Sequence, residues 1–473
     1  MKSLIKFAIV YLFIQLTFVS TPTSAQQWDW VKTFGGSGKC IAYDATTDND
    51  GNIIVAGSFT GTVFFNNTKL VNDGIKDFFI AKYDTDGNLI WVKQSVSNKD
   101  NEAYGVVCDK SGNIFITGYF SGLVKLSDNI SINSENEKNC FVIKYDKNGM
   151  FIWASRTNGV FDKYGKDLTI DKNGNILITG VFKNDISFFY EDEITGIDKG
   201  DNNEDKETER SFTLNSKGAS DIFIAKYSCN NELLWAKQSD GDGTAESASI
   251  KSDNKGNSYI TGYFTNTCSF GEMKLISKGG KDIIVVKYDS TGNVIWANQP
   301  CKSETDMQSC GMNIDKNNNI FLTGYFSGTA IFGKTKLESK NNDDIFISKM
   351  DYNGNALWAK QAGGTGNEYG REIVSGSDGN IYITGGFNSG FDFGTSKISN
   401  AGDWDIFVLK FDSQGNALNG FSAGSKGSDK AIGLVVNDKN KIFVLGSISG
   451  SANFNGNIIK SKGDNDDFVA KIK

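Results

Sequence analysis

The sequence contains no histidine among its 473 residues. Ser-His-Asp and Cys-His nucleophile systems both need an imidazole base, so neither exists in this chain. Zinc, copper and iron sites that depend on histidine ligands are excluded for the same reason. A catalytic centre would have to use carboxylates, tyrosine, lysine or arginine, and the sequence predicts no cofactor and no metal.

The chain also has few prolines and no excess of positive charge. There are 2 prolines against 53 glycines, which indicates many tight turns and argues against a proline-rich stalk. The 56 acidic and 49 basic residues give a net charge of −7, and the chain has no long basic run. Binding to a phosphate backbone is therefore not expected, and we predict no nucleic-acid partner.

Long apolar runs are missing after the first 25 residues. Residues 1–25 combine Lys2 and Lys6, the apolar run "FAIVYLFIQLTFV" and small residues ending at Ala25. This pattern is typical of a signal peptide, with a membrane anchor as the alternative. No later run approaches the roughly 18 residues that a membrane span needs. We therefore expect an exported protein, secreted or held in the cell envelope, with no membrane span.

Cysteine is present in an odd number, seven. Cys301 and Cys310 lie in one expected loop, "CKSETDMQSC", and are the candidates for a disulfide in an exported protein. Cys108, Cys140 and Cys268 fall in or beside apolar runs and are expected to pack as small hydrophobic residues.

What the chain has in abundance is one repeated segment. "DGNIYITGGF" at 378–387 has close copies such as "SGNIFITGYF" at 111–120. An apolar run such as "FIAKYD" at 79–84 and a tryptophan-centred run recur in the same order, with a period near 61 residues. The tryptophan positions are Trp30, Trp91, Trp153, Trp235, Trp296 and Trp358, with Asn419 in the remaining slot.

Each repeat predicts four antiparallel strands. Runs rich in Ile, Val, Phe, Tyr and Thr alternate with Gly, Asn and Asp, and several runs are apolar on both faces, as in stacked sheets. We therefore predict an all-β fold, a β-propeller, with a solenoid as the alternative. After residue 25 the chain opens on a fourth strand, "WDWVKTF", and it closes on a third, "FVAKIK". A ring joins these strands, so residues 26–473 are predicted to form seven blades, the last closed by the N-terminal strand.

The repeat resembles a known family. The order "D-x-x-G-N-I-Y-I-T-G … D-I-F-I-A-K-Y-D-x-x-G-N-x-L-W-A" is similar to the bacterial β-propeller repeat labelled SBBP, over residues 27–473. The resemblance is weaker in the last repeat, which has "NKIF" in place of "GNIY". It implies an exported or cell-surface bacterial protein, and the Lys-, Asn- and Ile-rich composition is similar to that of Bacteroidota proteins.

Propeller geometry would divide the connections between two faces. The short Asp-x-x-Gly turns share one face, and they resemble the start of a calcium loop but lack its distal ligands. The more variable connections share the other face, where we expect any ligand to bind. Trp404 departs from the repeat on that face and is a candidate platform for a sugar or a partner, or else a cap on its blade. The repeated tryptophans are expected to pack between neighbouring sheets.

Two further sets of polar residues recur from repeat to repeat. Each set is expected to form a crown at one end of the channel or, alternatively, to bond loop backbone. The first set follows the tryptophan runs, and the second begins the following strand. They are Gln94, Arg156, Gln238, Gln299 and Gln361, and then Glu102, Glu246, Asp306, Glu368 and Asp429.

An acidic insertion of about 20 residues falls in the third blade, at about 188–216. It is expected to be a solvated loop or an arm that docks a partner. Taken together, the sequence predicts an exported, monomeric, non-enzymatic binding or scaffold propeller whose ligand is a glycan or a protein. The alternative is a carbohydrate-active enzyme, a lyase or hydrolase, with carboxylate, Tyr and Arg groups in the central funnel. A group of such residues particular to a few blades would favour that alternative.

Overall fold

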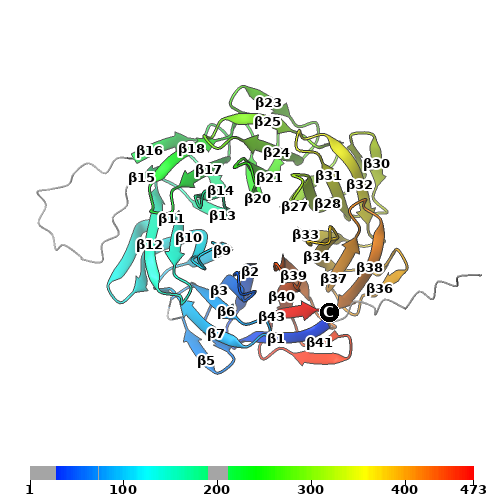
Figure 1. The fold of residues 1–473 in the computed structure, drawn as a ribbon, viewed down its shortest axis with the longest axis horizontal. Coiled ribbons are helices and arrows are strands. Elements are labelled where there is room, and N and C mark those ends of the chain that lie inside the picture. The colour runs from blue at the N-terminus through cyan, green and yellow to red at the C-terminus, as the bar shows by residue number, and fades with distance from the viewer. Residues whose placement is uncertain (1–27, 73, 190–210) are drawn as a thin grey trace, which may run out of the picture.

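The computed structural model describes residues 28–72, 74–189 and 211–473, and within these ranges the chain consists of strands and turns. The predicted signal peptide and residues 190–210 of the predicted insertion lie outside the described residues. The described part contains no helix with the length and apolar character to cross a bilayer. The protein is an all-β propeller in which antiparallel sheets stand around a central opening (Figure 1).

Five sheets have four strands each, and in all five the first strand borders the central opening (Figure 1). We call the first strand of a sheet the inner strand and the fourth the outer strand. The sheets are β2 (Cys40–Thr47), β3 (Ile53–Phe59), β6 (Asp77–Tyr83) and β7 (Leu89–Gln94); β13 (Lys163–Ile170), β14 (Ile176–Phe182), β17 (Asp221–Tyr227) and β18 (Leu233–Gln238); β20 (Ala245–Ser252), β21 (Ser258–Phe264), β24 (Asp282–Tyr288) and β25 (Val294–Asn298); β27 (Met307–Ile314), β28 (Ile320–Phe326), β31 (Asp344–Met350) and β32 (Ala356–Ala362); and β33 (Glu368–Ser375), β34 (Ile381–Phe387), β37 (Asp405–Phe411) and β38 (Ala417–Ala423).

Two larger sheets contain the same four-strand unit. One holds β9 (Asn101–Cys108), β10 (Ile114–Ser127), β11 (Ile130–Tyr145) and β12 (Phe151–Asn158). The other runs in the order β39, β40, β43, β1 and joins strands from the two ends of the described chain. These are β39 (Lys430–Val436), β40 (Ile442–Ile448), β43 (Asp466–Ile472) and β1 (Trp28–Gly36), the last two paired antiparallel with Val31 opposite Ala470.

The connection between the second and third strands forms a small outer hairpin, which the repeat pattern treats only as a variable segment. In the sheet of β10 and β11, these two strands simply extend into the hairpin. The other hairpins are β4 (Thr62–Phe65) with β5 (Thr68–Val71), β15 (Asp185–Phe189) with β16 (Ser211–Asn215), β22 (Thr267–Phe270) with β23 (Met273–Ile276), β29 (Thr329–Phe332) with β30 (Thr335–Glu338), β35 (Phe391–Phe393) with β36 (Ser396–Ile398), and β41 (Ser451–Phe454) with β42 (Asn457–Lys460). Short strands β8 (Val96–Ser97), β19 (Asp240–Gly241) and β26 (Cys301–Ser303) pair with β10, β22 and β29.

The hydrophobic core lies between neighbouring sheets. Strand β3 is buried along its whole length, as is β6 beside it, because both of their faces are covered. A single cluster combines Ile54 and Phe78 of one sheet with Ile116 and Phe141 of the next. This packing explains why the second and third strands of each repeat are apolar on both faces.

The repeated turns hold the inner strand to the second strand. In the turn after β2, the Asp48 carboxylate accepts backbone N–H groups of Asp50 at 3.0 Å and Asn52 at 2.9 Å. Gly51 has φ +86°, a conformation that favours glycine. Further along the second strand, a Cβ added to Gly118 would lie 1.9 Å from the Glu102 carbonyl oxygen. The turn therefore requires a glycine for its conformation, and the second strand requires one because the neighbouring backbone is too close for a side chain.

Candidate functional site

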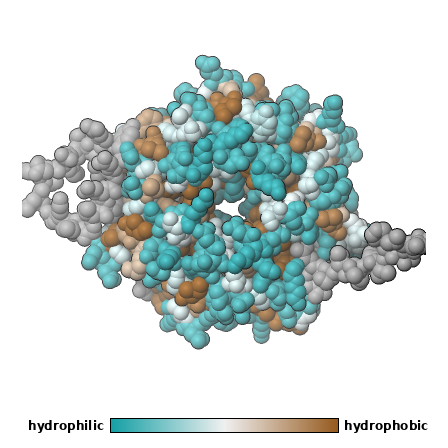
Figure 2. All heavy atoms as spheres, viewed as in Figure 1, coloured by the Kyte–Doolittle hydropathy of each residue, from teal (hydrophilic) through white to brown (hydrophobic). Residues whose placement is uncertain are grey.

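Tyrosines gather where the inner strands meet the variable connections. Tyr43 of β2 contacts Tyr104 of β9 at 4.8 Å between ring centroids. Tyr104 contacts Tyr119 at 5.7 Å, and Tyr119 contacts Tyr164 of β13 at 5.1 Å. The aromatic contacts thus run across three sheets at one mouth of the channel. The opening itself is visible in Figure 2, bordered mainly by hydrophilic residues.

A pocket of about 250 Å³ lies at this mouth, and we call it the Trp404 pocket. Its side chains come from β2, β33 and β39, together with Trp404, which directly precedes β37. The lining residues are Tyr43, Tyr369, Arg371, Gly386, Trp404, Lys430, Ala431 and Ile432. The pocket is therefore aromatic and cationic and contains no carboxylate in its lining.

Two stacked rings form one wall of the Trp404 pocket. Trp404 and Tyr369 have centroids 5.1 Å apart and planes inclined by 22°. The Lys430 ammonium lies 5.0 Å from the Trp404 ring, and the Arg371 guanidinium lies 5.6 Å from the Tyr369 ring. Both cations are exposed, while Trp404 is half-buried. Aromatic rings with cations over their faces suit a ligand that combines an apolar face with oxygen acceptors.

A glycine makes room for the indole. At the position before the last phenylalanine of the second strand, three other sheets carry Tyr119, Tyr263 and Tyr325, whereas β34 carries Gly386. A Cβ at Gly386 would lie 3.4 Å from Trp404. The two departures from the repeat therefore belong together. "ITGGF" in place of "ITGYF" is visible in the sequence, but only the fold places it under Trp404.

The structure separates the five predicted acids. Glu102 is buried, accepts the Tyr119 hydroxyl at 2.9 Å and forms an ion pair with Lys76. Glu246 is half-buried, and together with burial it raises the pKa of the Tyr263 hydroxyl. Glu368 is fully buried, and Asp429 bonds the backbone of Ser425 and Ser449. Asp306 accepts the backbone N–H of Lys281. These acids do not form one crown.

The predicted crown of Gln94, Gln238, Gln299, Gln361 and Arg156 is wrong. These residues lie at or just beyond the outer strands, away from the channel. Each amide bonds a backbone carbonyl of the outer hairpin of its own repeat, as Gln94 does with Val71 at 3.0 Å and Gln361 with Glu338 at 2.7 Å. Arg156 likewise donates to the Asn133 carbonyl at 3.4 Å. The alternative reading, that they bond loop backbone, describes them correctly.

The predicted disulfide is absent from the structure, where Cys301 and Cys310 are both free. The two residues belong to different elements with different surroundings. Cys301, in β26, packs in the apolar cluster around Phe332, whereas Cys310, in β27, has Arg371 as a neighbour. Cys140 and Cys268 pack in apolar clusters as predicted, and Cys108 packs beside one.

Deeper in the channel lies a charged group that the sequence reasoning missed, and we call it the waist cluster. It consists of Asp44, Asp167, Glu372 and Lys251, from four different sheets, around a cavity of about 190 Å³. The Lys251 ammonium lies 3.3 Å from Asp167, which also accepts the Ser249 hydroxyl at 2.8 Å.

The three acids of the waist cluster occupy one repeat position, at or next to the bulge of the inner strand, where the other repeats have Gly or Ser. This replacement of Gly or Ser by an acid in three repeats was the sequence signal that could have revealed the cluster. Burial and Asp167 raise the pKa of Glu372 to about 7, although Lys251 opposes the shift. Burial and Asp167 also raise the pKa of Asp44. Desolvation opposes the charge of Lys251, but Asp167, Glu372 and Asp44 raise its pKa.

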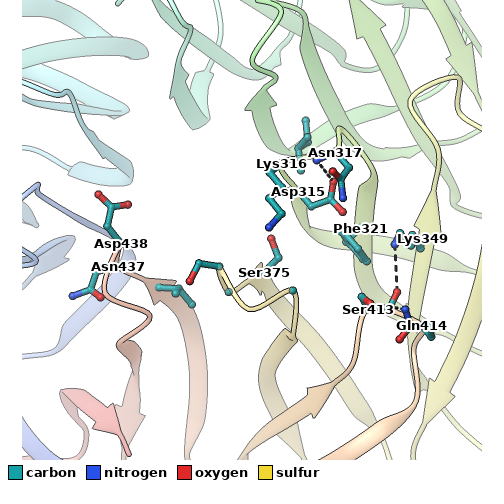
Figure 3. A pocket seen from close by; sticks show the side chains of 15 residues that line it. Asp315, Lys316, Asn317, Phe321, Lys349, Ser375, Ser413, Gln414, Asn437 and Asp438 are labelled. Atoms are coloured by element: carbon teal, nitrogen blue, oxygen red, sulfur yellow. Dashed lines mark hydrogen bonds between the residues drawn. The ribbon is translucent and has the colours of Figure 1, made fainter.

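The opposite face carries a larger hollow of about 690 Å³, formed by turns of three adjacent sheets (Figure 3). Asp315, Lys316 and Asn317 border one side, and Asn437 and Asp438 border the other. The polar groups are largely used within the turns: Asp315 accepts the Asn317 N–H at 2.8 Å, and Asn437 accepts the N–H groups of Lys439 and Lys441. Among the described residues that line this hollow, Phe321 is the one aromatic side chain, so the hollow has no stacked aromatic wall.

Among the described residues, no group of three or more Cys, Asp or Glu side chains is arranged to hold a metal ion. The turn aspartates bond the backbone of their own turns, as Asp48 does.

Comparisons with known proteins give distant relatives, and no family model matches the chain. An uncharacterised WD-repeat-containing protein of Acanthamoeba polyphaga mimivirus is 23% identical over 89% of this chain. The alignment covers 36% of that protein, so the chain spans about a third of its length. The regulatory protein FlaEY of Caulobacter vibrioides is 26% identical over 34% of this chain and 17% of its own length. The resemblance to SBBP repeats stays a prediction.

Solved structures show similarly distant likeness. A protein of unknown function from Bacteroides caccae has a TM-score of 0.34 at 11% identity, covering 73% of this chain and 89% of its own. A gluconolactonase from Xanthomonas campestris has a TM-score of 0.31 at 10% identity, covering 93% and 97%. A puromycin hydrolase has a TM-score of 0.35 at 9% identity, covering 86% and 58%.

Proposed function

We propose that the protein is an exported, seven-bladed propeller that binds a saccharide in the Trp404 pocket without cleaving it. The pairing of β1 with β43 supports closure of the ring by the N-terminal strand. The signal-peptide pattern of residues 1–25 supports export, to the cell envelope or the exterior. The protein acts as a monomer, with no nucleic-acid partner.

The observation that carries the proposal is the stacked pair of Trp404 and Tyr369 in a pocket that Gly386, in place of a tyrosine, also lines. The apolar face of a pyranose ring packs against an indole, and its hydroxyls reach the polar groups around it. The pocket lies on the variable face, where a binding function was expected. The repeated tryptophans, by contrast, pack between sheets, as Trp235 does against Tyr288 at 6.4 Å.

The test is native affinity electrophoresis of the protein through gels that contain neutral or acidic polysaccharides. We expect at least one polymer to retard the protein. Trp404→Ala should abolish the retardation, and Gly386→Val should weaken it by filling the pocket while keeping the indole. Gly386 does not have a positive φ, so valine adds bulk without the strain of that conformation. Tyr352→Ala, which removes an exposed ring on the turn face, is the control. Unaltered mobility in every gel would contradict the proposal.

A second candidate is a carbohydrate-active enzyme that uses the waist cluster. The specific observation in its favour is that Asp44, Asp167, Glu372 and Lys251 occur in particular blades and not in every repeat. A carboxyl group whose pKa is raised to about 7, as in Glu372, can act as an acid beside a second carboxyl group. Cleared zones in the same gels, lost in Glu372→Gln, would favour this candidate over the non-enzymatic one.

A further inference from the structure

We infer that the saccharide of the Trp404 pocket is acidic, carrying a carboxylate or a sulfate group next to the ring that stacks on Trp404. The inference rests on the proposed function, because it names the class of sugar that the same pocket takes. The evidence for an acidic sugar is the charge of the side chains around the aromatic wall.

Arg371 and Lys430 carry the positive charge of the pocket. Both are exposed at the pocket, and among the described residues neither has a carboxylate within ion-pair distance. Their close neighbours are ring faces and the Cys310 thiol, which give a cation little neutralisation. Two cations of this kind, held on adjacent inner strands β33 and β39, make a local positive site on a protein whose net charge is −7.

Asp343 is the acid that acts on the aromatic wall: together with burial it raises the pKa of the Tyr369 hydroxyl, but it does not line the Trp404 pocket. Glu102 forms an ion pair with Lys76 and accepts a hydrogen bond from the Tyr119 hydroxyl. Glu246 interacts with Tyr263. Neither acid lines the Trp404 pocket. Arg371 and Lys430 are therefore the only charged side chains in the lining of the Trp404 pocket.

The size of the pocket agrees with a single sugar ring. A cavity of about 250 Å³ is at the small end for ligand sites, and its stacked wall is one indole wide. A ring seated on Trp404 would have Lys430 and Arg371 beside it, close enough for charge-assisted hydrogen bonds to an acidic substituent. Neighbouring sugars of a polymer would lie over the channel mouth.

The ligands for the test are polygalacturonate, alginate and hyaluronan, compared with neutral polymers. Methyl-esterified polygalacturonate has the same sugar without its charge and is the matched ligand control. We expect the acidic polymers to bind at least tenfold more tightly than the esterified form, as measured by retardation and by calorimetry. Binding should weaken as salt rises from about 50 to 300 mM, since exposed charges are screened.

The variant for the test is Arg371→Gln/Lys430→Gln. It should lose at least tenfold in affinity for acidic polymers. The charge-matched control is Lys237→Gln/Lys360→Gln, which removes two exposed cations from outer strands and should keep the affinity. Thermal unfolding of each variant checks that the fold is retained.

The two proposals fail in different ways. If neutral polymers bind as tightly as acidic ones, and if Trp404→Ala abolishes binding while Arg371→Gln/Lys430→Gln does not, the inference is overturned and the proposed function stands. If no polymer is retarded at all, both are overturned. If Arg371→Gln/Lys430→Gln and its control lose the same affinity for acidic polymers, these polymers bind through the overall charge of the protein. That result also overturns the inference.

Discussion

At the scale of single residues, burial raises the pKa of carboxyl groups, and Glu368 is the example. Glu368 is 0% exposed; one of its carboxyl oxygens accepts the Gly364 N–H at 2.8 Å, and the other has no hydrogen-bond partner among the described residues. Burial, aided by Asp344, raises the pKa of Glu368 to about 7. The carboxyl is therefore protonated in the folded protein at pH values where it is ionised in the unfolded chain.

Glu368→Gln tests this pKa. Because the folded-state pKa is raised, the stability that this group contributes is present below its unfolded pKa near 4.5 and is lost as pH rises through about 7. The free energy of unfolding of the wild type relative to the variant should therefore fall by about 1–3 kcal/mol between pH 5 and pH 8. Urea unfolding at both pH values measures it, with exposed Glu304→Gln as the control. Parallel pH dependence of wild type and Glu368→Gln would refute the assignment.

At the scale of the structural elements, the tryptophans of the outer strands contact a turn of the next sheet. The Trp235 indole N–H donates to the Ser290 carbonyl in the turn after β24, at 3.3 Å. In the same turn, a Cβ at Gly292 would lie 2.8 Å from the indole. Asn419 departs from this pattern. Its side-chain oxygen accepts the Ser396 hydroxyl at 3.0 Å.

Two glycine variants separate this contact from backbone strain. Gly292 and Gly174 have similar positive φ values, +85° and +83°, but a Cβ at Gly174 would meet nothing within 4 Å. Gly174→Ala should cost about 1 kcal/mol through strain alone. Gly292→Ala should cost about 2–4 kcal/mol, because the methyl group also displaces the indole. Chemical unfolding measures both, and equal losses would show that the indole contact does not matter.

At the scale of the whole molecule, the proposed closure makes two distant parts of the chain into one sheet. Val31 faces Ala470 across β1 and β43. Antiparallel neighbours of this kind are close enough for a disulfide, whereas a residue one strand further away lies at roughly 10 Å. Val444, which pairs with Ala470 from β40, is such a residue.

A cross-link tests the closure. Val31→Cys/Ala470→Cys should form an intramolecular disulfide that joins the two terminal peptides. It should stabilise the oxidised protein by about 2–4 kcal/mol relative to the reduced form, since it closes a very long loop. Peptide mass spectrometry and thermal unfolding measure these effects. Val31→Cys/Val444→Cys is the control and should not cross-link. Links only between chains would contradict closure within one molecule.

The candidate site could be predicted only in part. Trp404 was identified from the sequence because it breaks the repeat, and its setting on the variable face agrees with that reasoning. The glutamines were misplaced, because a repeat gives the position of a residue along a strand but not the distance of that strand from the channel. Gly386, Arg371 and Lys430 were missed, because they come from two sheets and approach Trp404 only in the folded ring.

The sequence by itself determined the strand pattern, the turns and the propeller class. Those features depend on local periodicity, on glycine in left-handed turns and on apolar runs, all of which repeat within about 61 residues. Only the tertiary structure decided which side chains meet in the channel. The waist cluster joins Asp44 to Glu372, which are far apart in sequence, and the Trp404 pocket joins Tyr43 to Lys430. Contacts of that kind arise from the arrangement of the sheets around one axis. A local sequence pattern does not specify that arrangement.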